Sequence, residues 1–250
     1  MTRSAGVGAG TQALEHVLSL AAPQRMSEVI ARMRAIVRAL PPSDGVVAFT
    51  TLYLAVTEAV NQVVRAQVFE DERFTRTLDV TFANLYLDAL RDFAGDGSVP
   101  RAWAPLVEAR ARHDVMPLQF ALAGMNAHIN RDLPVALVET CEALGVELRT
   151  SSPQHRDFRR IDAVLARTEA HVKSRFITGA LAEADVALGQ LDDCVAMWNV
   201  ERAREAAWVN AEALWALRAT PQLGSDFLHT LDGMVGFASR GLLRPLVSRA

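Results

Sequence analysis

The sequence has few cysteines and lacks any long apolar run. Its two cysteines, Cys141 and Cys194, cannot build a disulfide framework, and no Cys-x-x-Cys metal spacing occurs. No segment reaches the roughly 20 apolar residues that a membrane span needs. The N-terminal stretch carries Glu15 and His16 in its apolar part, which is untypical of a signal peptide. We therefore expect a cytoplasmic protein with reduced thiols and no membrane span.

An excess of positive charge is also absent. The formal net charge of −3 provides no basic field for a phosphate backbone, so a nucleic-acid partner is not expected. The glycine-rich phosphate-binding motifs, the Gly-x-Ser-x-Gly elbow and His-Glu-x-x-His are all missing. We therefore expect no cofactor. With 50% apolar and 22% charged residues, the balance is that of a globular protein with a sizeable core.

Strand signals are absent as well, because no sustained two-residue alternation or hairpin dipeptide occurs between apolar runs. Apolar residues recur at helical spacing along nearly the whole chain. The pattern predicts an all-α fold. The expected helices are 11–21, 24–39, 45–68, 71–93, 101–112, 115–131 (bent or restarted at Pro134 and continuing to 144), 158–177, 180–188, 190–218 and 222–239.

The predicted helices form one unit, since no linker, low-complexity stretch or repeat of fixed period divides the chain. We expect a single domain over 1–250, with residues 1–10 flexible. Helices 45–68, 71–93 and 115–131 are apolar on most sides and belong in the centre of a multi-helix globule. A homodimer through an exposed amphipathic helix is left open.

Polar residues inside these apolar helices are the candidates for a functional site, because a buried charge costs several kcal/mol unless it is paired. His128 and Asp132 are four residues apart and share one helix face. This spacing suits a metal site or an imidazole whose tautomer a carboxylate sets, and equally a structural cap before Pro134. Asn126 lies on a neighbouring face and completes the polar floor of a predicted cavity.

Asp79 and Glu58 are further candidate acids. Asp79 stands between apolar neighbours, with Tyr86 two turns on, and burial would raise its pKa unless an arginine pairs with it. Glu58 lies beside a ridge that includes Tyr53, and the alternative for this ridge is a surface rim. We expect Asp79, Glu58, Asp132 and His128 as catalytic groups, with Tyr53, Tyr86 and Asn126 binding substrate.

Arginine and tryptophan alternate near the C-terminal third. Trp198 and Arg202 are one turn apart, as are Arg204 and Trp208, a spacing that suits cation–π pairs or ordinary packing. An inward-facing Arg202 would pair with Asp79 or with a substrate, and Trp198 would line the same site. His155 is the candidate for a third metal ligand or a proton carrier.

Three segments together resemble an actinobacterial family of unknown function. They are Asp44–Phe49, Leu78–Val80 and Leu118–Leu133, and the last contains the sequence GMNAHI followed by Asn130, Arg131 and Asp-Leu. The resemblance covers about 25 to 215 and implies an all-helical domain without an agreed activity. In size and helical character the chain is also similar to small helical cyclases that close spiroacetal rings in polyketide biosynthesis.

These observations leave three hypotheses. The first is an acid–base enzyme without metal that acts on a small, apolar, hydroxylated molecule, such as a hydroxyketone that closes to a spiroacetal. The second is a metal-dependent hydrolase using His128, Asp132, His155 and Asp79, since helical zinc phospholipases also carry His-x-x-x-Asp. The third is a non-catalytic helical module, which predicts no ordered polar cluster facing a cavity.

Overall fold

The computed structural model describes residues 12–65, 69–95, 97–162, 165 and 199–245, and all regular elements there are helices. The predicted all-α class is confirmed. Short helical stretches cover 12–19 and 153–162. The labelled helices are α2 (Met26–Ala39), α3 (Gly45–Arg65), α4 (Glu72–Ala94), α5 (Ala104–Ala109), α6 (Pro117–Ala127), the π-helical turn η1 (His128–Asp132), α7 (Leu133–Leu144), α10 (Val200–Leu217) and α11 (Pro221–Leu242).

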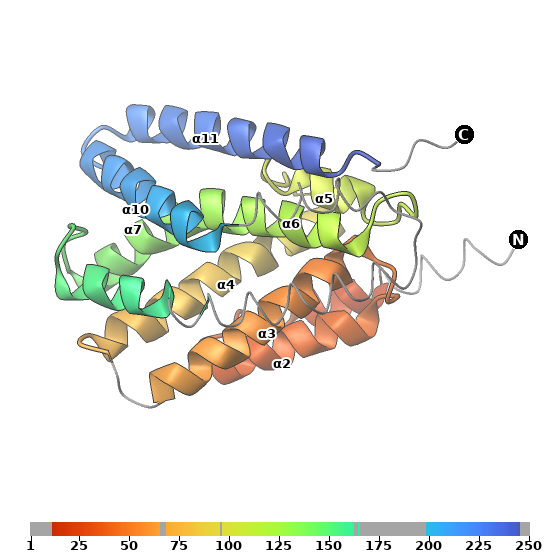
Figure 1. Cartoon of the computed structure of the whole chain (residues 1–250), viewed down its shortest axis with the longest axis horizontal. Coiled ribbons are helices and arrows are strands. Elements are labelled where there is room, and N and C mark those ends of the chain that lie inside the picture. The colour runs from red at the N-terminus through yellow and green to blue at the C-terminus, as the bar shows by residue number, and fades with distance from the viewer. Residues whose placement is uncertain (1–11, 66–68, 96, 163–164, 166–198, 246–250) are drawn as a thin grey trace, which may run out of the picture.

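The helices pack side by side, with α2 and α11 at opposite edges and α4, α6 and α7 between them (Figure 1). Helix α6 packs against both α3 and α11, and residues 118–124 are all buried. A helix that is apolar on all sides belongs in the centre of a globule. Within the described ranges, no helix is both long enough and apolar enough to cross a bilayer.

Glycines let α3 and α6 approach closely. A Cβ atom on Gly124 would lie 2.3 Å from the Phe49 ring, and one on Gly45 would lie 2.4 Å from the Phe120 ring. Each glycine therefore leaves room for an aromatic side chain of the facing helix. This packing places Phe49 beside His128, with ring centroids 5.9 Å apart.

Asp44 caps the start of α3. Asp44 Oδ1 accepts a hydrogen bond from the Val46 N–H at 2.9 Å, and Oδ2 accepts one from Arg110 Nη2 at 2.6 Å. The predicted restart at Pro134 is confirmed, since α7 begins at Leu133 and ends at Leu144. The chain stays helical through η1 and into α7, with Pro134 near the start of α7. The wider π turn shifts the hydrogen-bond register, so proline is accommodated in a continuing helix.

Other helix boundaries differ from the prediction. Of the helix expected over 190–218, residues 190–198 lie outside the described part of the chain. Helix α10 begins at Val200, where Asn199 Oδ1 accepts the Arg202 N–H at 2.9 Å and caps the helix. The helix expected from residue 158 already begins at 153. The expected helix 180–188 and the flexible residues 1–10 lie outside the described part of the chain.

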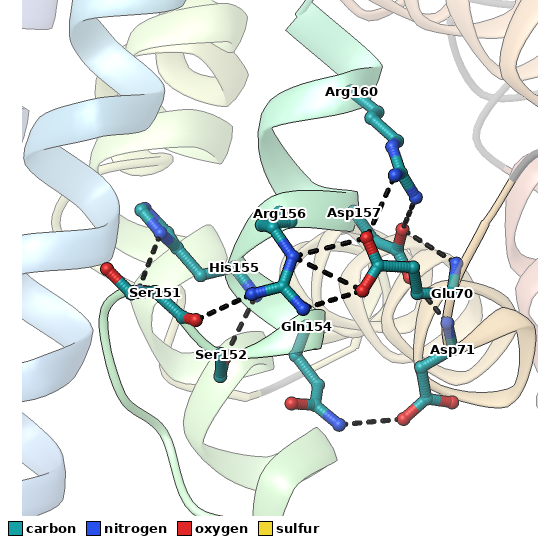
Figure 2. Close-up of polar contacts among 9 residues, drawn as sticks. All are labelled: Glu70, Asp71, Ser151, Ser152, Gln154, His155, Arg156, Asp157 and Arg160. Atoms are coloured by element: carbon teal, nitrogen blue, oxygen red, sulfur yellow. Dashed lines mark hydrogen bonds and ion pairs between the residues drawn. The ribbon is translucent and has the colours of Figure 1, made fainter.

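A polar cluster fastens the helix 153–162 to the connection between α3 and α4 (Figure 2). Asp157 is fully buried, and its carboxylate accepts the backbone N–H groups of Glu70 at 2.9 Å and Asp71 at 2.6 Å. Glu70 in turn pairs with Arg156 at 2.6 Å. The cluster fixes the helix whose next turn forms one wall of the cavity described below.

Candidate functional site

A cavity of about 90 Å³ lies among α3, α4, η1, α10 and the helix 153–162. Most of its lining side chains are aliphatic or aromatic. Five lining residues are polar: Tyr53, Thr57, Asp79, His128 and Arg204. A mostly apolar cavity with a few convergent polar groups is typical of a small-molecule site. Its volume suits a small molecule or the reacting end of a longer one.

His128 and Asp132 form a buried pair in the π turn. His128 Nδ1 lies 3.1 Å from Asp132 Oδ2, as their spacing predicted. Trp103 Nε1 donates to the same oxygen at 2.9 Å, and Arg131 Nη1 donates to Oδ1 at 2.8 Å. Both carboxylate oxygens act as acceptors, so the shared proton belongs on Nδ1 of the imidazole.

The second ring nitrogen of His128, Nε2, differs from Nδ1 in its surroundings. Nε2 is buried and has no hydrogen-bond partner among the described residues. Phe82 stacks on the imidazole with ring centroids 3.5 Å apart, and Tyr53 lies 4.5 Å from it. Burial lowers the pKa of His128, and the neighbouring Asp132 opposes this shift only in part. A neutral imidazole with a free Nε2 lone pair can accept a proton.

Asp79 supplies an acid on the same cavity wall. It lies one turn before Phe82 on α4, and no described residue donates a hydrogen bond to its carboxyl. Burial raises the pKa of Asp79 from 3.8 to about 7, and the positive charges of Arg204 and Arg76 limit the rise. The carboxyl group therefore keeps its proton in a substantial fraction of molecules at neutral pH.

Arg204 is the cation of the cavity. Its Nε donates to Asp162 Oδ1 at 2.7 Å, and Nη2 donates to the Phe158 carbonyl at 2.8 Å. The guanidinium lies 3.9 Å from the centroid of the Phe158 ring. The carboxylate of Asp162 neutralises the charge of Arg204, so Arg204 does not require an anionic ligand. Desolvation lowers the pKa of Arg204, and Asp162 counters this effect.

Tyr53 lies close to the base His128 and interacts electrostatically with the acid Asp79. Burial raises its pKa well above 10, and the negative charges of Asp79 and Asp132 raise it further. The neighbouring Thr57 hydroxyl, also part of the lining, lowers it through a hydrogen bond. Tyr53 therefore remains a phenol that can donate a hydrogen bond to a ligand oxygen.

The profile of a family described as a family of unknown function (DUF5995) matches residues 26–245. The chain belongs to this family. No curated protein and no solved structure matches it significantly. The predicted membership of a family of unknown function is thus confirmed, and the chemistry of this DUF5995 chain must be argued from its own residues.

Glu58 and Tyr86 are among the predicted site residues of the DUF5995 chain that lie outside the cavity lining. Glu58 points away from the site and pairs with Arg34 at 2.6 Å, near the surface. Tyr86 is fully buried, and its hydroxyl is 2.6 Å from Thr50 Oγ1. Glu58 therefore belongs to the surface rim that was the alternative for this ridge, and Tyr86 belongs to the core.

Asn126 holds two helices together. Its Nδ2 donates to the Val235 carbonyl and to Ser239 Oγ, both at 3.0 Å, and its Oδ1 accepts from Asn130 at 2.9 Å. All these contacts join α6 and η1 to α11 or to one another. Asn126 therefore lies outside the cavity lining, with its amide hydrogen-bonded on the side of α11.

The prediction that Arg202 faces inward from α10 is wrong. Arg202 is exposed, whereas Arg204 is buried on the same face as Val200 and Trp208. The guanidinium of Arg204 stacks on Phe158 in place of the predicted Trp208. Trp198 lies outside the described residues.

The three proposed metal ligands are not brought together. His155 packs on Trp208 with centroids 4.6 Å apart, and its Nδ1 accepts the Ser151 N–H at 3.1 Å. His128 and Asp132 instead bond to each other. In the ranges that the structure describes, no group of three or more His, Cys, Asp or Glu side chains is arranged to hold a metal ion.

Sequence reasoning missed two residues of this region, Arg204 in the lining and Trp103 behind it. The helical periodicity of α10 carried a signal for Arg204, because Val200, Arg204 and Trp208 recur every four residues. Trp103 comes from a loop next to α5, so its contact with Asp132 depends on tertiary packing. No local pattern could have identified it.

Proposed function

We propose that this protein is an acid–base enzyme that acts on a small, uncharged, largely apolar molecule carrying hydroxyl and carbonyl groups. One observation carries the proposal: Asp79 and His128 line the same cavity with pKa shifts in opposite directions. Groups whose surroundings push their pKa values apart are suited to the acid and base roles of one reaction. The balanced charges around Arg204 favour a neutral ligand.

The reaction that suits this arrangement best is closure of a hydroxyketone to a spiroacetal. His128 Nε2 takes the proton of a hydroxyl whose oxygen bonds to the carbonyl carbon, while the carbonyl oxygen takes the proton of Asp79. The imidazolium of His128 then returns its proton to the hydroxyl of the resulting hemiketal, and this hydroxyl leaves as water. A second hydroxyl then bonds to the same carbon and gives its proton to Asp79, which restores both groups.

The other lining groups support this chemistry. The Tyr53 phenol can hold the carbonyl or hemiketal oxygen beside Asp79, and the apolar walls can enclose the carbon chain. The likeness in size and helical character to spiroacetal-forming cyclases agrees with this choice. We further propose that the protein works in the cytoplasm, in secondary metabolism, on a polyketide-like substrate.

The test uses a short saturated dihydroxyketone whose two hydroxyls can both reach the carbonyl. Spiroacetal formation is followed by gas chromatography with wild type, Asp79→Asn, His128→Asn and Glu58→Gln. We expect wild type to accelerate closure, the first two variants to lose about 10²–10⁴-fold, and Glu58→Gln to retain the rate. Closure no faster than in buffer would overturn the spiroacetal proposal.

The same samples separate the other two hypotheses. Activity that survives complete chelation rejects a metal-dependent hydrolase, whereas activity lost on chelation supports it. Binding of the dihydroxyketone without turnover would identify a ligand-binding module. The unpaired Nε2 of His128 in the cavity lining supports the enzyme over that module, because a buried polar atom without a partner is often retained for a catalytic role.

A further inference from the structure

The Asp132 carboxylate accepts hydrogen bonds from two donors in addition to His128, namely Trp103 and Arg131. Its Oδ2 accepts both the Trp103 indole N–H at 2.9 Å and the His128 Nδ1–H at 3.1 Å. Its Oδ1 accepts from Arg131 at 2.8 Å. Asp132 and Trp103 are fully buried and Arg131 is largely so. Charge-assisted hydrogen bonds of this kind are among the strongest in proteins.

A second carboxylate holds both additional donors in place. Asp232 on α11 accepts the backbone N–H groups of Arg101 at 2.8 Å and Ala102 at 3.0 Å, directly before Trp103. Its Oδ1 also lies 3.6 Å from Nε of Arg131. One side chain of α11 therefore fixes the loop that carries the indole and orients the guanidinium.

We propose that Trp103 and Arg131 are positioning residues that keep His128 neutral, with its proton on Nδ1 and Nε2 open to the cavity. Each donor withdraws negative charge from Asp132, so the carboxylate orients the imidazole without drawing a second proton onto it. Without these donors, Asp132 would stabilise the imidazolium more strongly, and a larger fraction of the base would be protonated at neutral pH.

The charged and titratable groups around His128 come from several elements. They are Asp132 and Arg131 of η1, Tyr53 of α3, Tyr86 and Asp79 of α4, and Arg204 of α10. Tyr53 and Tyr86 remain protonated, since burial raises the pKa of both. Among the described residues, Asp132 alone is hydrogen-bonded to the imidazole, so Trp103 and Arg131 act on His128 through their hydrogen bonds to Asp132.

The experiment is a pH titration of ¹⁵N-histidine-labelled full-length protein by NMR, with His128→Asn assigning the signal. In wild type we expect a neutral Nδ1–H tautomer at pH 7. In Trp103→Phe and Arg131→Met we expect the pKa of His128 to rise by about one unit. Tyr86→Phe and Arg101→Met are the matched controls, because they alter the same neighbourhood without removing a donor to Asp132.

The role of His128 Nε2 as a base rests on the proposed function. The titration measures only the protonation of His128 and needs no substrate. An Nε2–H tautomer in wild type, or unchanged titration in both donor variants, would overturn the positioning role even if the enzyme is active. If Trp103→Phe does not fold, Arg131→Met decides the question alone. The Arg131 side chain is 16% exposed, so its replacement disturbs the core less than the loss of the fully buried indole. Failure to turn over the dihydroxyketone would overturn the proposed function and leave the positioning result standing.

Discussion

Asp79 and His128 illustrate how burial alone can prepare two residues for opposite roles. The same loss of hydration makes a carboxylate hold its proton and makes an imidazole release one. The pKa of Asp79 lies at about 7, and that of His128 lies below its ordinary 6.5. Between these values a protonated acid and a neutral base coexist in the cavity.

The first prediction at this scale concerns the pH dependence of turnover. The rate should rise as His128 loses its proton, which happens below pH 6.5, and fall as Asp79 loses its proton near pH 7. The profile of kcat/KM for the dihydroxyketone is therefore a narrow bell with its maximum between the two values. A rate that keeps increasing above pH 8 would contradict Asp79 as the acid.

The second prediction concerns the stability cost of this acid. Because the folded pKa of Asp79 is raised above its unfolded value of 3.8, the native state binds the extra proton and stability falls as pH rises from about 4 to 7. Asp79→Asn mimics the neutral form. We expect it to stabilise the protein by about 2–4 kcal/mol at pH 8 and to have little effect near pH 4.

Urea unfolding at both pH values measures this difference. Glu58→Gln is the control, because Glu58 is in a partly exposed pair that contributes about 0–1 kcal/mol at either pH. Destabilisation by Asp79→Asn at pH 8 would show that the carboxylate is well paired in the native protein.

Sequence reasoning at the residue scale succeeded where one helix carries the whole arrangement. The contact between His128 and Asp132 follows from their spacing, and the position of Asp79 among apolar neighbours indicated its burial. It failed for Glu58 and Asn126, because the side of a helix that faces a cavity depends on which neighbour covers the other sides.

At the scale of elements, the π turn and the glycine contacts shape the site. The π turn places His128 and Asp132 within hydrogen-bonding distance while the chain continues past Pro134. Single π turns inside helices occur frequently at functional sites. The sequence could predict an irregularity near Pro134 but not its form, since the hydrogen-bond register of a buried helix is decided by packing against its neighbours.

Gly124 gives a prediction for the contact between α3 and α6. An added methyl group would clash with the Phe49 ring, so Gly124→Ala should destabilise the protein by about 1–3 kcal/mol and disturb the aromatic wall next to His128. Gly224→Ala is the matched control, because its nearest neighbour would be 3.8 Å away. That variant should stabilise α11 by about 0.5–1 kcal/mol.

Thermal unfolding and the turnover rate are measured for both glycine variants. The expected result is a lower Tm and a lower rate for Gly124→Ala only. Equal stability of Gly124→Ala and wild type would mean that α6 can move away from Phe49 without cost.

At the scale of the whole molecule, the polar cluster of Figure 2 joins distant parts of the chain. Asp157 binds the backbone before α4 and thereby positions the helix 153–162, which supplies Ile161 to the cavity and Asp162 to Arg204. Asp157 stands near the start of its own helix, where the local sequence explains an acidic residue without any distant partner. Its long-range role could not be predicted because its partners lie 86 and 87 residues away.

We predict that Asp157→Asn destabilises the protein by about 2–3 kcal/mol, since an amide cannot accept both N–H groups as a carboxylate does. Arg156→Gln should cost only about 0–1 kcal/mol, because its pair with Glu70 is exposed. Chemical denaturation of the two variants gives these values. A larger loss in Arg156→Gln would assign the fastening of this helix to the surface ion pairs and not to the buried carboxylate.

The predicted single-domain, all-helical architecture depended on features that the whole chain shares, namely helical periodicity and the lack of strand signals. The arrangement of helices around a cavity is a different matter. It depends on pairings such as Gly124 with Phe49 and Asp232 with the loop before Trp103, which join positions far apart in the sequence.

The most direct test of the account is a simultaneous NMR titration of the Asp79 carboxyl carbon and the His128 ring nitrogens in one sample, with Asp79→Asn and His128→Asn for assignment. The account predicts that Asp79 titrates at about 7 and His128 below 6.5, so that the protonated acid and the neutral base are present together. An Asp79 carboxyl that is ionised already at pH 5, or an imidazole that is charged at pH 7, would contradict it.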